Sequence, residues 1–88
     1  MANDQGPDEE YFRSELSQAE TALRAIAKQA PLLIAMGNAA ELEGFIEQFV
    51  AMAERTATEA RARHADEVVR RLGELVVAAR QMRYAGQA

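Results

Sequence analysis

The sequence contains no cysteine and no tryptophan, and its 88 residues include one histidine and two prolines. Without cysteine the chain can form no disulfide scaffold, and it has no thiolate for metal binding or nucleophilic attack. The single imidazole, at His64, is too little for a site that needs three or four convergent metal ligands. We therefore expect no enzyme activity, no catalytic residue, no metal site and no cofactor.

Long apolar runs and a basic excess are also missing. The longest apolar run, Ala30 to Met36, has seven residues, whereas a membrane-spanning helix needs roughly 20. The polar helix faces mix both charge signs, which does not suit a helix lying on a membrane. The acidic first ten residues differ from a secretory signal or transit peptide. The net charge of −4 argues against nucleic-acid binding. We expect a cytoplasmic protein with neither membrane nor nucleic acid as partner.

The two halves of the chain carry charge of opposite sign. Residues 1–47 hold nine acids and three bases, a net charge of −6, and residues 48–88 hold five acids and seven arginines, a net charge of +2. Such halves attract each other when the chain folds antiparallel or when copies pair head to tail. Each exposed pair contributes only about 0–1 kcal/mol, so the pattern influences pairing more than stability.

The residues that are abundant are strong helix formers, above all alanine, glutamate, arginine and leucine. After a polar lead over residues 1–7, apolar residues recur across 12–33 at alternating steps of four and three. This spacing is the heptad stripe of a helix that packs lengthwise on another helix, as in a coiled coil. The sequence therefore predicts a first helix over about 8–30, within a single helical domain over 8–84.

A break is expected after this helix. Pro31 has no N–H and its ring clashes with the preceding turn, which predicts a kink or break followed by a turn over about 31–38. Gly37 is placed to cap the last turn in a left-handed conformation. Asn38, with Glu41 three positions on, has the spacing of a capping box at the start of the next helix.

The second apolar stripe runs from 42 to 82 without losing its phase. It favours one continuous helix over about 39–84, with a frayed end over 85–88. Such a helix forms a hairpin with the first, and its uncovered far end favours assembly into a dimeric bundle. The alternative is a monomeric three-helix bundle in which the chain turns near residues 63–66, with Asp66 as an N-cap. Both architectures are all-α.

Two sets of residues follow from the stripes. In either architecture we expect bulky core residues at Phe12, Leu16, Leu23, Ile26, Leu42, Phe45, Ile46, Phe49, Leu72 and Leu75. In the long hairpin, the apolar face beyond residue 60 exceeds what the first helix covers, so it must meet another molecule. The residues expected at this partner surface are Val68, Val69, Leu72, Leu75, Val76 and Met82, with Arg70, Arg71 and Arg80 at its rim.

Few other residues suggest a site. His64 lies on the predicted stripe with Glu67 three positions on, which makes a pH-sensitive contact one hypothesis. A half-buried histidine bonded to a carboxylate or to water is the plainer interpretation. Glu43, Glu47 and Glu54 share one helix face, but the chain has no Glu-x-x-His pair to complete a di-metal bundle. A solvated acidic face is expected there.

These observations predict a small non-catalytic helical interaction protein, a self-associating adaptor or chaperone-like scaffold that works through apolar helix faces. The expected partner is a second copy, in a homodimer, together with a second protein. One alternative is a regulatory protein such as an antitoxin or a transcription-factor accessory. Another is a helical bundle that holds a ligand or metal. The alanine- and arginine-rich composition is typical of a bacterial protein.

Overall fold

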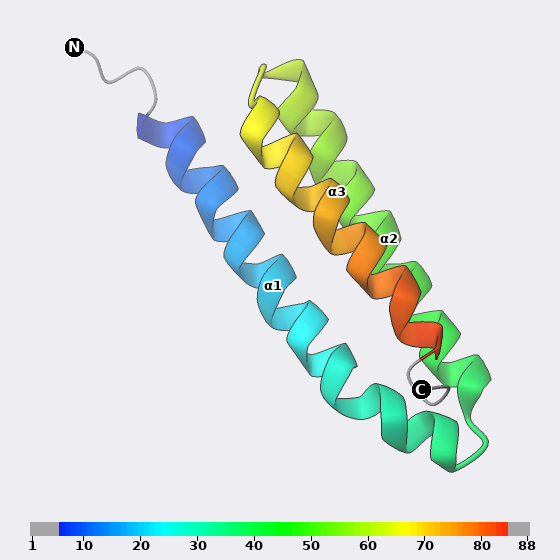
Figure 1. The fold of residues 1–88 in the computed structure, drawn as a ribbon. Coiled ribbons are helices and arrows are strands. Elements are labelled where there is room, and N and C mark those ends of the chain that lie inside the picture. Colours follow the sequence, from blue (N-terminus) through cyan, green and yellow to red (C-terminus); the bar gives the residue numbers. More distant parts are fainter. Residues whose placement is uncertain (1–5, 85–88) are drawn as a thin grey trace.

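The chain folds into three helices that form an elongated bundle. The computed structural model describes residues 6–84 and contains α1 (Gly6–Ala35), α2 (Ala39–Ala62), α3 (Asp66–Gln81) and a short 3₁₀ turn, η2 (Met82–Tyr84). Figure 1 shows α1 and α3 running in the same direction and α2 running opposite to both. The bundle measures 54 × 19 × 17 Å. The all-α prediction is confirmed.

The predicted ends of the chain fall largely outside this description. Of the polar lead over 1–7, the last two residues belong to α1, which starts at Gly6, and the rest lies outside the described residues. The frayed end predicted for 85–88 also lies outside them. None of the helices between residues 6 and 84 combines the length and the apolar character that crossing a bilayer requires.

Helix α1 does not stop at Ala30 as predicted but continues through Pro31 to Ala35. A proline removes only its own N–H from the hydrogen-bond ladder, and the ladder resumes where Met36 N–H donates to the Leu32 carbonyl at 2.9 Å. Figure 1 shows α1 changing direction over its last third, which contains the proline. The predicted disturbance is therefore a bend, and the turn shortens to residues 36–38.

The end of α1 is closed by a Schellman motif, which is the left-handed cap that the sequence predicts. Gly37 has φ +80°, and its N–H donates to the Ile34 carbonyl at 3.1 Å. Asn38 N–H reaches back to the Leu33 carbonyl at 2.7 Å. Asn38 is the N-cap residue of α2, but its side chain makes no cap hydrogen bond. The predicted capping box is therefore not formed, because the backbone of Asn38 is already held by the cap of α1.

A second Schellman motif ends α2 and decides between the two predicted architectures. Ala65 N–H donates to the Ala60 carbonyl at 2.8 Å, and His64 N–H donates to the Arg61 carbonyl at 3.1 Å. His64 takes the left-handed conformation, with φ 61°, at the position that glycine usually fills. The continuous helix expected over 39–84 is thus replaced by α2 and α3, and the chain adopts the three-helix alternative. The N-cap of α3 is Ala65 rather than Asp66.

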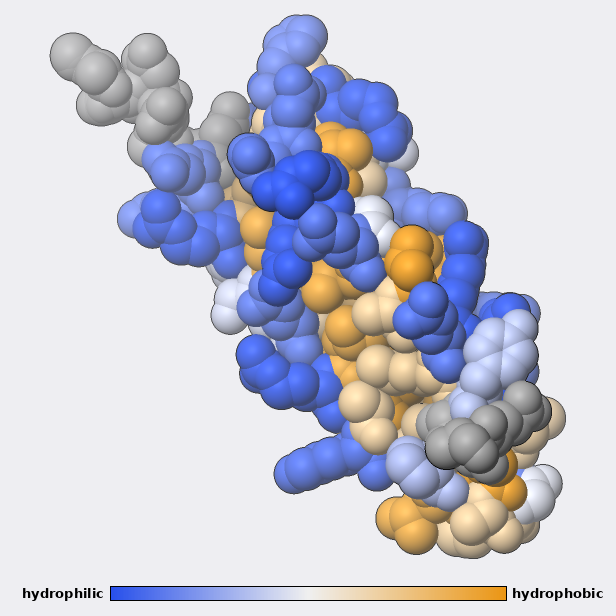
Figure 2. Space-filling view, in the orientation of Figure 1, coloured by the Kyte–Doolittle hydropathy of each residue, from blue (hydrophilic) through white to orange (hydrophobic). Residues whose placement is uncertain are grey.

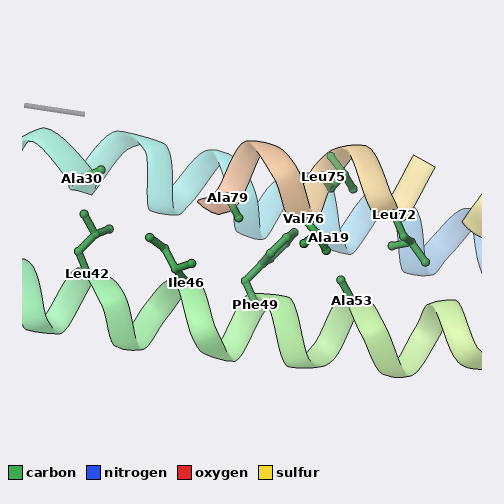
Figure 3. Close-up of a cluster of buried hydrophobic side chains, with 10 residues drawn as sticks. All are labelled: Ala19, Ala30, Leu42, Ile46, Phe49, Ala53, Leu72, Leu75, Val76 and Ala79. Atoms are coloured by element: carbon green, nitrogen blue, oxygen red, sulfur yellow. The ribbon is translucent and has the colours of Figure 1, made fainter. Parts of the chain in front are cut away.

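The core lies where the three helices meet along the rod. Figure 3 shows buried side chains from α1, α2 and α3 converging there. Among the expected core residues, the fully buried ones are Phe12, Leu42, Ile46, Phe49, Leu72 and Leu75. The half-buried ones are Leu16, Leu23, Ile26 and Phe45. Small side chains alternate with these bulky ones, since Ala19, Ala53 and Ala79 are each 0% exposed, and they let the helices approach closely.

Replacing His64 with glycine tests the strain at the second reversal. Because a left-handed conformation costs a non-glycine residue about 1 kcal/mol, we expect His64→Gly to raise the free energy of unfolding by about 0.5–1 kcal/mol. Ala51→Gly, which places the glycine at an exposed position in the middle of α2, is the matched control and should lower it by a similar amount. Urea denaturation followed by circular dichroism measures both variants. An unchanged or less stable His64→Gly protein would contradict this account of the turn.

Gly73, in the middle of α3, should limit the stability of that helix. A methyl group added there meets no atom of the other described elements within 4 Å, so Gly73→Ala should stabilise the protein by about 0.5–1 kcal/mol through helix propensity. At Gly37, where φ is +80°, the same replacement should destabilise by about 1 kcal/mol. Thermal denaturation of the two variants should shift in opposite directions. Equal shifts would overturn the distinction.

Candidate interaction surface

Half of the predicted apolar partner surface lies inside the chain's own core. Leu72 is 1% exposed, Leu75 6% and Val76 9%, because α3 turns back at residues 63–65 and buries these side chains against α1 and α2. They are not open to a partner in this structure. Val68, Val69 and Met82 are half-buried.

The arginines predicted at the rim of that surface are paired within the chain. Arg70 donates to Glu67 at 2.6 Å and to Glu74 at 2.9 Å. Arg71 donates across to Glu20 on α1 at 2.8 Å, and these carboxylates raise the pKa of both guanidinium groups. The Arg80 guanidinium stands 3.8 Å from a carboxylate of α2. Of these pairs, Arg71–Glu20 joins the basic second half of the chain to the acidic first half, so part of the predicted attraction acts within one molecule.

A further ion pair, which the sequence analysis did not anticipate, fastens the end of the chain to α2. Arg83 Nη2 donates to Glu43 Oε1 at 3.1 Å, and Arg83 Nε lies 3.0 Å from Glu43 Oε2. The Nε atom is buried and makes no hydrogen bond of acceptable geometry. Glu43, which we expected on a solvated acidic face, instead holds η2 against the start of α2.

His64 lies at the rim of an open groove at the end of the bundle where α2 meets α3. The groove has a volume of about 630 Å³, and Phe12, Leu16 and Val68 line its floor. Its rim carries both charge signs, and Glu67, the predicted partner of His64, is bonded to Arg70 instead. His64 itself is exposed because its left-handed backbone lies outside both helices. Its proposed pH sensitivity stays a hypothesis.

The described residues give no sign of a metal-binding group. Between residues 6 and 84, histidine and carboxylate side chains nowhere gather in groups of three or more that could hold an ion. Glu47 and Glu54 line a shallow groove beside Arg80 and Arg83, so the acidic row faces the cations of α3 and η2. This arrangement supports ion pairing along the groove between α2 and α3.

The opposite end of the bundle, formed by residues 29–40 and named here the α1–α2 tip, has a different surface. Leu32 is 62% exposed and Met36 66%, and the surrounding side chains of the tip carry no charge. Figure 2 shows mainly apolar atoms at this lower end, continuing upward between charged borders. The sequence analysis noted the apolar run but placed it in the predicted turn over about 31–38. The missing signal was the absence of charged residues between Lys28 and Glu41.

Two cations border the tip on α1. Arg24, Lys28 and Leu32 follow one another at spacings of four on α1, so each lies beside the next on the helix surface, and Met36 follows just past the end of α1. All four are exposed. Neither Arg24 nor Lys28 forms an ion pair or side-chain hydrogen bond with the described residues. This face therefore joins free positive charge to exposed apolar surface.

Comparison with known proteins provides no relative. No family model matches the chain, and neither the curated proteins nor the solved structures contain a significant match. The surface chemistry is thus the basis for the functional proposals below.

One pH-dependent contact crosses the groove between α1 and α2. Tyr11 Oη donates to Glu59 Oε1 at 2.9 Å, and this hydrogen bond is the main cause of the raised pKa of Tyr11. Because the pKa is higher in the folded chain than in the unfolded one, the contact stabilises the fold below about pH 10. That stabilisation is lost as the pH rises through the folded-state pKa.

Ultraviolet titration of tyrosinate tests this contact. In a Tyr84→Phe background, which leaves Tyr11 as the one titrating tyrosine, we expect Glu59→Gln to lower the pKa of Tyr11 toward its ordinary value. Glu54→Gln, whose side chain faces Arg80 instead, is the control and should leave the pKa unchanged. The contact would be refuted if Tyr11 titrated at the same pH with Glu59 and with glutamine.

Proposed function

We propose that the protein is a small, non-catalytic helical interaction protein that binds a protein partner through the α1–α2 tip. The observation that carries this proposal is the exposure of Leu32 and Met36, at 62% and 66%, within an uncharged stretch of the surface. Scattered exposed apolar residues are ordinary, but a contiguous apolar patch on a small protein usually marks a contact site.

The dimensions of the tip favour a second protein over a second copy. The bundle is 19 by 17 Å in cross-section, so an end-to-end contact between two tips buries roughly 600 Å² in total, about half of the ~1,200 Å² at the lower bound of specific interfaces. A partner with a concave apolar surface can cover the sides of the tip as well as its end. The proposed scaffold or adaptor role is therefore that of a convex helical end inserted into such a surface.

Substituting the two exposed apolar residues tests the proposal. Leu32→Gln/Met36→Gln should change stability by no more than about 0.5 kcal/mol, because neither side chain is buried. The wild-type chain should retain a partner protein from a lysate of its own organism. We expect the amount of that protein recovered with the variant to be lower by about tenfold or more. Quantitative mass spectrometry of affinity-purified samples measures this loss.

Val77→Gln is the matched control, because Val77 is 55% exposed but lies on α3, away from the tip. This variant should retain the partner. Identical captured proteins for the wild type and the Leu32/Met36 variant would refute the proposal. A stable homodimer in analytical ultracentrifugation that the double substitution dissociated would also refute it, because the tip would then bind a second copy.

A further inference from the structure

The part of α1 that leads to the tip carries two positive charges followed by exposed apolar side chains. From Thr21 to Ala40 the only charged residues are Arg24 and Lys28, and both are positive. Lys28 stands about one turn and Arg24 about two turns before Leu32 on the surface of α1, and Met36 follows just past the end of the helix. This stretch is cationic in a chain whose net charge is −4.

The two cations lack the carboxylate partners that Arg70, Arg71 and Arg83 have within the bundle. The carboxylate nearest to Arg24 in sequence on the same helix face is Glu20, which is bonded to Arg71 of α3 at 2.8 Å. Lys28 has no acidic residue three or four positions away on either side. Among residues 6–84 no carboxylate forms an ion pair with either cation, so both are open to the carboxylates of a partner.

We infer that the partner of the tip is an amphipathic helix whose apolar face covers Leu32 and Met36 and whose carboxylates contact Arg24 and Lys28. This inference rests on the proposed function and specifies the chemistry of its partner. From Arg24 to Met36 the face extends about 18 Å at 1.5 Å per residue. A partner helix of roughly 12 residues matches that length. Packing of such a helix along α1 uses side chains at i, i+3, i+4 and i+7.

A second copy of the chain does not supply the required complement. If two copies paired antiparallel through this face, centred on Ala30, each cation would lie against an apolar side chain of its partner. In a parallel pairing, Arg24 and Lys28 would lie against their own equivalents, and like charges repel. An anionic lipid surface would gain about 1 kcal/mol from each cation, but Glu41 in the first turn of α2 adds an exposed carboxylate at the same end.

Titration with two designed peptides tests the inference. The peptides are helical, share one leucine stripe and differ only in carrying glutamate or lysine beside it. With the full ¹⁵N-labelled chain, the glutamate peptide should shift the amide signals of residues 24–36 and bind about tenfold more tightly than the lysine peptide at low salt. High salt should reduce this preference, because it screens the exposed charges.

Variants identify the residues responsible. Arg24→Glu/Lys28→Glu should reverse the preference between the two peptides, and Leu32→Gln/Met36→Gln should abolish binding of both. Arg55→Glu changes an exposed cation on α2, away from the proposed face, and should leave the preference unchanged. Arg24→Gln/Lys28→Gln should remove the preference between the two peptides without reversing it. Circular dichroism of each variant checks that its helices are intact.

Several results would overturn the inference. In the peptide titration, these are equal affinity for the two peptides or no binding of either. Concentration-dependent dimers that require Leu32 and Met36 would also overturn it, as would tighter binding to phosphatidylglycerol vesicles than to the glutamate peptide. Failure of the inference is distinguishable from failure of the proposed function. A captured protein that depends on Leu32 and Met36 but tolerates Arg24→Glu/Lys28→Glu keeps the function and overturns the acidic partner.

Discussion

Between Arg63 and Ala65 the chain reverses, and whether the apolar side chains of α3 are buried within the same chain depends on that reversal. If α2 and α3 were one helix, the valines and leucines beyond residue 66 would need a second molecule to cover them. With His64 in the left-handed conformation, the same residues become the core of one chain, where Leu72 is buried against the other helices. A single backbone conformation, costing about 1 kcal/mol, thus separates a self-contained bundle from an obligate assembly.

The same reversal also brings charged side chains of opposite sign together. Turning α3 back brings Arg71 of the basic second half to Glu20 of the acidic first half, and it also places Arg80 near Glu54 of α2. η2 completes the arrangement through Arg83 and Glu43. The tip differs from the rest of the rod because its own side chains carry no charge and the two cations beside it form no ion pair with the described residues.

The sequence was sufficient to predict the helical fold, the bulky core and the cap at Gly37, because each of these depends on local spacing. It placed the second reversal near residues 63–66 only as the alternative to a continuous helix, since a histidine there carries no glycine signal and the apolar stripe keeps its phase across the turn. The stripe does so because α2 and α3 face one common core. The tip was missed for a different reason. The run from Ala30 to Met36 resembles core until the fold shows that it lies at an end of the bundle.

Pro31 has a consequence for how that end behaves mechanically. Since proline offers no amide hydrogen, the carbonyl of Ala27 has no partner in the helical ladder. The final turn of α1 is consequently joined to the body through one main-chain hydrogen bond fewer than an uninterrupted helix would have. Bending at this point costs less than it would elsewhere along α1. Leu32 and Met36 thus follow the point of α1 that resists bending least, while Ala30, Leu33 and Ile34 keep the same segment packed on the core.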